Sequence, residues 1–284
     1  MANVLEKFNQ QNSQFSAIKE VYCRNEMNFE LFYSGNIIKV QFQDGKVKRY
    51  GQFKKKEGMF LAKLTNKVVK QRIESGQYIP KNKDPMRYRN NTIMYSSERI
   101  KENLFKPCVS VDIVGCYWQT AFNLGVIDEK TYLIGISKDR EYKDARNISI
   151  GSIGALLTHE KYVNGKLISC EKSRKFGACA RLDIIDHVWA MANWIAGKLG
   201  TDFLMYLTDC FFIPEHRLDD LCSYIEVEGY KWKAERCQFG EVRPMHSGID
   251  KTGKKIFTEK VIWYNVEKDK VKFHDFSHNH NFNF

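Results

Sequence analysis

Residues 109 to 113, Val-Ser-Val-Asp-Ile, decide the fold of this chain. Three β-branched apolar residues alternate with two polar ones, and a period of two predicts a strand with one apolar face. Asp112 therefore points to the opposite face, at the end of that strand. Gly115 ends the strand, and a helical pattern begins at Cys116 and closes at Gly125, a typical C-cap glycine.

The turn after this strand combines a carboxylate with the start of a helix. The Asp112 carboxylate can hold a cation, and backbone N–H groups around Gly115 and Cys116 can hold a phosphate. Asp209 lies in a comparable setting, as the only charged residue of the apolar run 203 to 213. Taken alone, Asp209 either caps a tight turn or binds a metal. Two aspartates that each end an apolar strand favour a shared metal site.

The first segment resembles a palm motif of family B DNA polymerases, Asp-x-x-Ser-Leu-Tyr-Pro. Residues 112 to 118 match its Asp at Asp112 and its Tyr at Tyr117. The closest resemblance is to the small protein-primed polymerases of phages and linear plasmids. It covers residues 105 to 235 and is most specific at the two aspartates.

Two further motifs of that family have counterparts along the chain. The family motif Tyr-Gly-Asp-Thr-Asp-Ser aligns without a gap to residues 205 to 210, which keep its Thr and its second Asp, Asp209. Leu207 stands at the position of the first Asp of this motif. In the family, the second Asp of this motif and the Asp of the earlier motif together bind the metals. The motif Lys-x-x-x-Asn-Ser-x-Tyr-Gly fits residues 146 to 154, with Arg for Lys and without its Asn, Ser and Tyr.

The resemblance implies an α+β fold in which a polymerase-like palm, an antiparallel sheet backed by helices, carries a DNA-directed DNA polymerase site. It implies two Mg²⁺ (or Mn²⁺) ions and a nucleotidyl transfer from nucleoside triphosphates to DNA, as primer-template or single strand, with a priming or replication protein as a further partner. The implied ligands of the metals are Asp112, Asp209 and the backbone carbonyl of Ile113. The implied nucleotide contacts are Gly115, Cys116, Tyr117, which would exclude a ribose 2′-hydroxyl, and Lys138 and Arg146 on the triphosphate.

Several departures from the family leave other functions open. Only 34 residues separate Asp112 from Arg146, so the fingers would be short, and no proofreading exonuclease is expected before the palm. The main alternative is a polymerase-fold protein that binds DNA without catalysis, as a replication accessory or initiator. A primase-like or terminal transferase activity is the third possibility. No phosphate-binding G-x-x-x-x-G-K-[ST] loop is present, which excludes a P-loop NTPase.

Composition is that of a globular protein, with 43% hydrophobic and 13% aromatic residues among 284. No apolar run approaches the length of a membrane span, and the first residues lack the apolar core of a signal peptide. We therefore expect a cytoplasmic protein, in the host cell if it is viral. The eight cysteines include no C-x-x-C pair, which argues against zinc ribbons and favours reduced thiols.

The net charge of +11 lies entirely in the first part of the chain: residues 1 to 107 hold 21 Lys and Arg against 10 Asp and Glu. Turn residues separate four expected strands at 29–33, 37–42, 47–50 and 59–64. We therefore expect a basic, β-rich nucleic-acid-binding module at residues 1 to 80, with the palm at 81 to 284. The expected DNA contacts are Lys54, Lys55 and Lys56 in this module, and Lys254 and Lys255 in a later basic turn.

The remaining expectations concern the scaffold. Helical periodicity predicts helices over residues 66–76 and 178–199, and Asn164-Gly165 predicts a tight hairpin turn. A strand is expected to return at 230–235, and residues 240 to 273 offer at most a small β thumb. The histidines of the C-terminal tail, His274, His278 and His280, are expected to be disordered rather than bound to a metal.

Overall fold

The computed structural model describes residues 16–34, 37–50, 56–87, 93–137, 139–249 and 255–277. It is an α+β fold of antiparallel sheets and helices that divides into two compact units. Unit 1 comprises residues 1–87 and 125–183, and unit 2 comprises residues 88–124 and 184–284. The division therefore differs from the single boundary expected after residue 80. Its physical reason is that an early strand and an early helix pair with partners from the middle of the chain.

Unit 1 contains a five-stranded antiparallel sheet in the order β3-β2-β1-β6-β7. Its strands are β1 (Phe29–Ser34), β2 (Ile37–Phe42), β3 (Val47–Tyr50), β6 (Leu156–Val163) and β7 (Lys166–Arg174). The first three strands and the tight turn between β6 and β7 lie where the sequence predicted them. One face is covered by the helical residues 16–24, and Tyr22 packs there against Phe29 and Phe42.

The helices of unit 1 are α2 (Lys56–Glu74), α5 (Glu129–Ile136) and α6 (Asp139–Ile153), and α2 packs against α6. The strand expected at residues 59–64 is wrong, because these residues belong to α2. Leu61, Thr65, Val68 and Val69 are buried, and their spacing is that of one helical face. The short apolar run that suggested a strand is the first turn of this buried face.

The long helix α7 (Ala178–Leu199), predicted with the same bounds, runs from unit 1 into unit 2. Its start is fixed within unit 1 by the buried carboxylate of Asp183. That carboxylate accepts hydrogen bonds from the Tyr78 hydroxyl, the backbone N–H groups of Lys81 and Asn82, and the Asn82 amide. The segment that follows α2 is thereby held on α7, and hydrogen bonding by Asp183 raises the pKa of Tyr78, although burial of the phenol is the larger cause.

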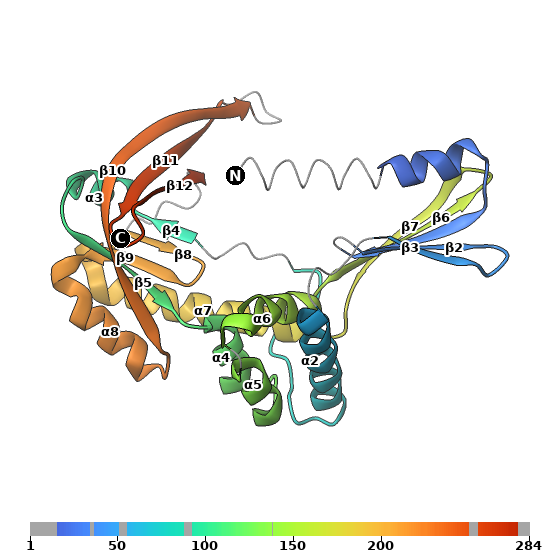
Figure 1. Ribbon diagram of the computed structural model, residues 1–284, viewed down its shortest axis with the longest axis horizontal. Helices are drawn as coiled ribbons and strands as arrows, with labels where there is room; N and C mark the ends of the chain where they lie inside the picture. Colours follow the sequence, from blue (N-terminus) through green and yellow to red (C-terminus); the bar gives the residue numbers. More distant parts are fainter. Residues whose placement is uncertain are drawn as a thin grey trace. The chain divides into compact units, whose positions relative to one another are not determined.

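Unit 2 is a seven-stranded antiparallel sheet in the order β12-β11-β10-β5-β9-β8-β4. Its strands are β4 (Ile93–Tyr95), β5 (Cys108–Ile113), β8 (Met205–Leu207), β9 (Cys210–Pro214), β10 (Trp232–Ile249), β11 (Lys255–Asn265) and β12 (Lys270–Ser277). Figure 1 shows β10 and β11 as long, curved ribbons. Residues 240 to 273 therefore extend the same sheet instead of forming a separate thumb.

Helices back one face of this sheet. They are α4 (Cys116–Asn123), α8 (Leu218–Val227) and the second part of α7, whereas the short α3 (Ser97–Glu102) contributes Ile100 to the core of the other face. Val109, Val111 and Ile113 of β5 are buried against the helices. Cys108 on the same strand belongs to the opposite core. This alternation is the one that the sequence of β5 predicts.

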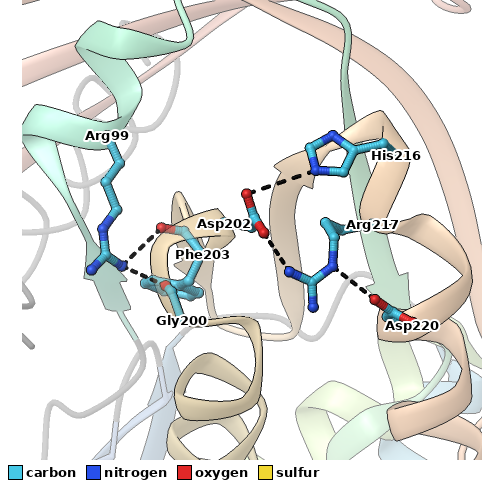
Figure 2. A network of polar contacts seen from close by, with 7 residues as sticks. All are labelled: Arg99, Gly200, Asp202, Phe203, His216, Arg217 and Asp220. Carbon is cyan, nitrogen blue, oxygen red and sulfur yellow. Dashed lines mark hydrogen bonds and ion pairs between the residues drawn. The ribbon is translucent and has the colours of Figure 1, made fainter.

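The connection from α7 to β8 is held by the polar network of Figure 2. The guanidinium of Arg99 donates to the backbone carbonyls of Gly200 (2.7 Å) and Phe203 (3.4 Å). Asp202 pairs with Arg217, which also donates to Asp220 at 2.7 Å. These contacts tie the short 3₁₀ helix Gly200–Asp202 to α3 and to the start of α8. They thus fix the point at which the chain enters β8.

The cysteines, the helices and the tail histidine His274 each bear on an expectation from the sequence. All eight cysteines are free thiols, as predicted. No described helix combines the length and the apolar composition that crossing a membrane requires. His274 is ordered on β12, where its ring contacts Phe276 edge-on, so the expectation of disorder is wrong for this residue. His278 and His280 lie outside the described residues.

Candidate active site

Asp112 lies near the end of the central strand β5, on the face that α7 and α8 do not cover. Its neighbours Val111 and Ile113 are fully buried on the helical face, whereas the Asp112 side chain is 31% exposed. The strand ends at Ile113, and Gly115, with φ of +62°, forms the N-cap of α4. Because glycine adopts this left-handed conformation without strain, the chain can turn from strand to helix within two residues of Ile113.

Asp209 lies in the two-residue turn between β8 and β9, next to the end of β5. Strand β9 pairs with β5 so that Asp112 stands opposite Cys210, the residue after Asp209. The backbone N–H of Ile113 donates to the carbonyl of Asp209 at 2.8 Å. This hydrogen bond joins the two segments at their ends and brings the two predicted aspartates to one edge of the sheet.

Two thiols near the end of β5, the buried Cys116 and the partly exposed Cys210, are influenced by both carboxylates. Burial raises the pKa of Cys116 well above its usual value, and the negative charges of Asp209 and Asp112 raise it further. Burial raises the pKa of Cys210 in the same way, again with contributions from Asp112 and Asp209. Both thiols are therefore neutral at physiological pH.

The turn that carries Asp209 has an unusual backbone. Thr208 has φ of +62°, and the N–H of Asp209 donates to the carbonyl of Leu207 at 2.7 Å. A three-residue turn with positive φ at its centre is rare and strained for a β-branched residue. The hydroxyls of Tyr117 and Tyr206 both donate to the carbonyl of Thr208 and hold this conformation.

Lys233 is a charged neighbour of Asp112 that the sequence analysis did not single out. It stands opposite Asp112 in the pairing of β10 with β5, and its Nζ lies 3.0 Å from Oδ2 of Asp112. The hydrogen bond to Asp112 raises the pKa of Lys233. The sequence predicts a strand at 230–235, but its pairing with β5 and the register that places Lys233 opposite Asp112 come from the structure.

Asp112 and Lys233 line a cleft of about 240 Å³ on this face. The other lining residues are Ser110, Leu207, Cys210, Phe212, Glu235, Trp263, Lys268 and Lys272. Asp209 is not among them. The cleft therefore lies beside the first aspartate and extends along the sheet toward β12, and Leu207 and Cys210, which flank the turn with the second aspartate, also line it.

Four other predicted site residues, Ile113, Gly115, Cys116 and Tyr117, also belong to the end of β5 and the start of α4. Arg146 belongs to unit 1, where it is buried and its guanidinium donates to the carbonyl of Gly135 at 2.8 Å. Lys56 begins α2 and Lys255 begins β11, but their side chains lie outside the described residues. Four further lysines, Lys54, Lys55, Lys138 and Lys254, lie wholly outside the described residues.

The donors at the end of β5 fit a hard divalent cation. Asp112 and Asp209 offer carboxylate oxygens, and both residues are partly exposed, so a cation can reach them. Among the described residues, no group of three or more His, Cys, Asp and Glu side chains is arranged to hold a metal. The chain would thus supply two carboxylates and the backbone carbonyl of Ile113. Water or substrate phosphates would complete the coordination shell, which is the arrangement that Mg²⁺ prefers.

Comparisons of the chain with protein-family models, with curated proteins and with solved structures found no match.

Proposed function

We propose that this protein is a template-directed DNA polymerase with a reduced, family B-like palm formed by the sheet of unit 2. One observation carries the proposal: Asp112 at the end of β5 and Asp209 in the β8–β9 turn lie at the same sheet edge, joined by the hydrogen bond from Ile113 N–H to the Asp209 carbonyl. An antiparallel sheet with a carboxylate on its central strand and another in the neighbouring hairpin suits a two-metal phosphoryl transfer.

In this proposal Asp112, Asp209 and the carbonyl of Ile113 hold two Mg²⁺ or Mn²⁺ ions. When bound, these ions supply the Lewis acid for attack of a primer hydroxyl on the α-phosphate and for departure of pyrophosphate. The protein's own contribution is positioning. Tyr117 and Tyr206 fix the Thr208 carbonyl and with it the turn that presents Asp209. The buried thiol of Cys116, kept neutral, adds no third negative charge.

The half-buried ring of Tyr117 supports its proposed role beside the sugar. Its hydroxyl donates to the Thr208 carbonyl at 3.1 Å, which favours one orientation of the ring at the start of α4. A fixed aromatic ring at that place would leave no room for a ribose 2′-hydroxyl. The triphosphate contacts proposed for Lys138 and Arg146, and the DNA contacts proposed for the basic residues of unit 1, remain separate proposals.

A non-catalytic DNA-binding function, as a replication accessory or initiator, is the second candidate. The observation that favours it is the ion pair between Lys233 and Asp112, which neutralises one of the two carboxylates. Leu207, in the place of a third carboxylate, points in the same direction. Both functions need DNA binding, so DNA affinity alone does not separate them.

Primer extension with aspartate variants separates the two functions. Asp112→Asn and Asp209→Asn should each abolish extension with Mg²⁺ or Mn²⁺ while DNA affinity stays the same or rises, because negative charge is removed. The matched control is Asp275→Asn. Asp275 is an exposed residue of β12, and its neighbour Phe276 is buried in the core on the Asp112 face, so Asp275 lies on the other face of the sheet. Folded Asp112→Asn and Asp209→Asn proteins that still extend primers would refute the polymerase. A wild type that binds DNA without extending any primer would establish the alternative.

A further inference from the structure

The cleft beside Asp112 brings together more positive than negative charge. Three ammonium groups, of Lys233, Lys268 and Lys272, face two carboxylates, of Asp112 and Glu235. They come from three strands and from the turn between β11 and β12, all in unit 2. Fully ionised side chains therefore leave the cleft with one positive charge in excess. Such a small cleft with converging ammonium groups suits an anion of the size of a phosphate.

The ion pairs within the cleft are unequal. Glu235 is held on both oxygens, by the Lys268 ammonium and by the amide of Asn265 at 2.8 Å, and it is the less exposed partner at 18%. Asp112 has one ammonium partner, Lys233, at 3.0 Å, and both side chains are substantially exposed, 31% and 48%. Lys272 makes no ion pair with any described residue. The pair of Asp112 with Lys233 is thus the one that another ligand can displace.

A divalent cation is such a ligand. An exposed ion pair contributes about 0 to 1 kcal/mol because water and salt screen it. A cation held between Asp112 and Asp209 interacts with two carboxylates at once and carries twice the charge of an ammonium group. It also repels the Lys233 ammonium from its position on Asp112. The cleft then has three ammonium groups and only one remaining carboxylate, that of Glu235.

We propose that this cleft is a phosphoryl-binding site that a divalent cation opens: the cation takes Asp112, and Lys233 joins Lys272 and Lys268 in binding a phosphate group. The Lys233–Asp112 pair is then a latch that keeps the site weak until the cation is bound. The inference rests on the proposed function for the cation at Asp112. The phosphate belongs either to a free nucleotide or to a nucleic-acid backbone, since both present the same group.

Binding of inorganic phosphate, measured by equilibrium dialysis with and without Mg²⁺, tests the latch without any catalytic assay. Wild type should bind phosphate at least about tenfold more tightly with Mg²⁺ than without it, a difference of about 1.4 kcal/mol. Asp112→Asn frees Lys233 permanently and should bind phosphate without Mg²⁺ as tightly as wild type does with it. Lys272→Ala, at an exposed edge strand, should lose phosphate binding under both conditions.

The matched control is Lys260→Ala on β11, whose neighbour Val261 faces the Asp112 side, so that Lys260 points away from the cleft. It should bind phosphate like wild type. Lys233→Ala gives a second variant that does not alter a carboxylate, and it should lose the Mg²⁺-dependent gain. Phosphate binding by wild type that does not depend on Mg²⁺ would overturn the latch. A folded Asp112→Asn protein that binds no phosphate without Mg²⁺ would also overturn it. Unchanged binding by Lys272→Ala would overturn the site.

Competition identifies the source of the phosphate. A deoxynucleoside triphosphate that displaces phosphate assigns the cleft to free nucleotide, and a single-stranded oligonucleotide that does so assigns it to the backbone. Displacement by neither contradicts the phosphoryl assignment. Primer extension is measured separately on the same proteins. Primer extension without Mg²⁺-dependent phosphate binding would support the polymerase and contradict the latch. Mg²⁺-dependent phosphate binding without primer extension would support the latch and contradict the polymerase.

Discussion

Replacing Thr208 by glycine should make unit 2 more stable and its candidate site less effective. Thr208 is exposed, so little packing is lost, but its φ of +62° in a three-residue turn suits only glycine. Such a conformation costs about 1 to 3 kcal/mol in a residue with a side chain. Glycine recovers this energy and loses about 0.4 to 1 kcal/mol through its more flexible unfolded state. The net stabilisation is about 1 kcal/mol, or about 3 to 5 °C in melting temperature for a unit of this size.

The same change removes the restraint on Asp209. A glycine at position 208 samples other turn conformations, so the carboxylate spends less time where the strained turn holds it, and primer extension should fall about ten- to a hundredfold. Thermal unfolding and steady-state extension measure the two effects. Thr208→Ala is the control, because it keeps a Cβ at this φ and loses only the β-branch, so its melting temperature should rise less than that of Thr208→Gly. A Thr208→Gly protein with an unchanged or lower melting temperature would refute the reasoning that strain is stored in this turn.

Two predictions concern unit 1. Gly165→Ala should destabilise it by more than about 2 kcal/mol, because φ is +70° and the new Cβ would collide with the carbonyl of Cys23. Gly45→Ala, with φ of +81° and open space around it, should cost only about 1 to 2 kcal/mol in the same denaturation assay, and equal costs would contradict the collision. Glu160 is buried, which opposes its ionisation, but hydrogen bonds from Lys19 and Tyr162 outweigh this and lower its pKa. The contribution of the Glu160 carboxylate to the stability of unit 1 is complete above its usual pKa of 4.5 and disappears as the pH falls through the lowered value. Glu160→Gln should therefore destabilise unit 1 at pH 7 and approach the stability of wild type in acid. A penalty that stays constant from pH 7 to pH 3 would exclude this linkage.

Local patterns in the sequence predict most of the elements that position the candidate site. Alternation around Asp112 fixes which face of β5 carries the carboxylate, and the apolar runs on both sides of Asp209 fix the hairpin. Helical periodicity gives α7 its bounds because the helix is long and strongly periodic. By contrast, the six residues 59–64 are too few for periodicity to separate a strand from a helical turn, and only burial along the whole of α2 decides it.

Pairings between distant segments are what the sequence alone could not supply. The contact of Lys233 with Asp112 depends on the register of β10 on β5, and a shift by one residue would place Lys233 on the other face. The division into units depends on β1 pairing with β6, across more than a hundred residues. Neither register leaves a mark in composition or local spacing. The lysines of the Asp112 cleft therefore become visible only when the sheet is assembled.

The interleaved course of the chain through its two units sets the order in which it can fold during synthesis. Strand β1 leaves the ribosome early but cannot complete its sheet until β6 has followed, and by then β5 has also emerged without either of its neighbours, β9 and β10. Both sheets thus wait for late segments, which makes folding slow and leaves apolar strand edges exposed in the meantime. A fragment ending at residue 80, or one starting there, would separate strands that belong to one sheet. Dissection of this protein must therefore remove residues 88–124 and 184–284 together, with a new connection made between the remaining segments of unit 1.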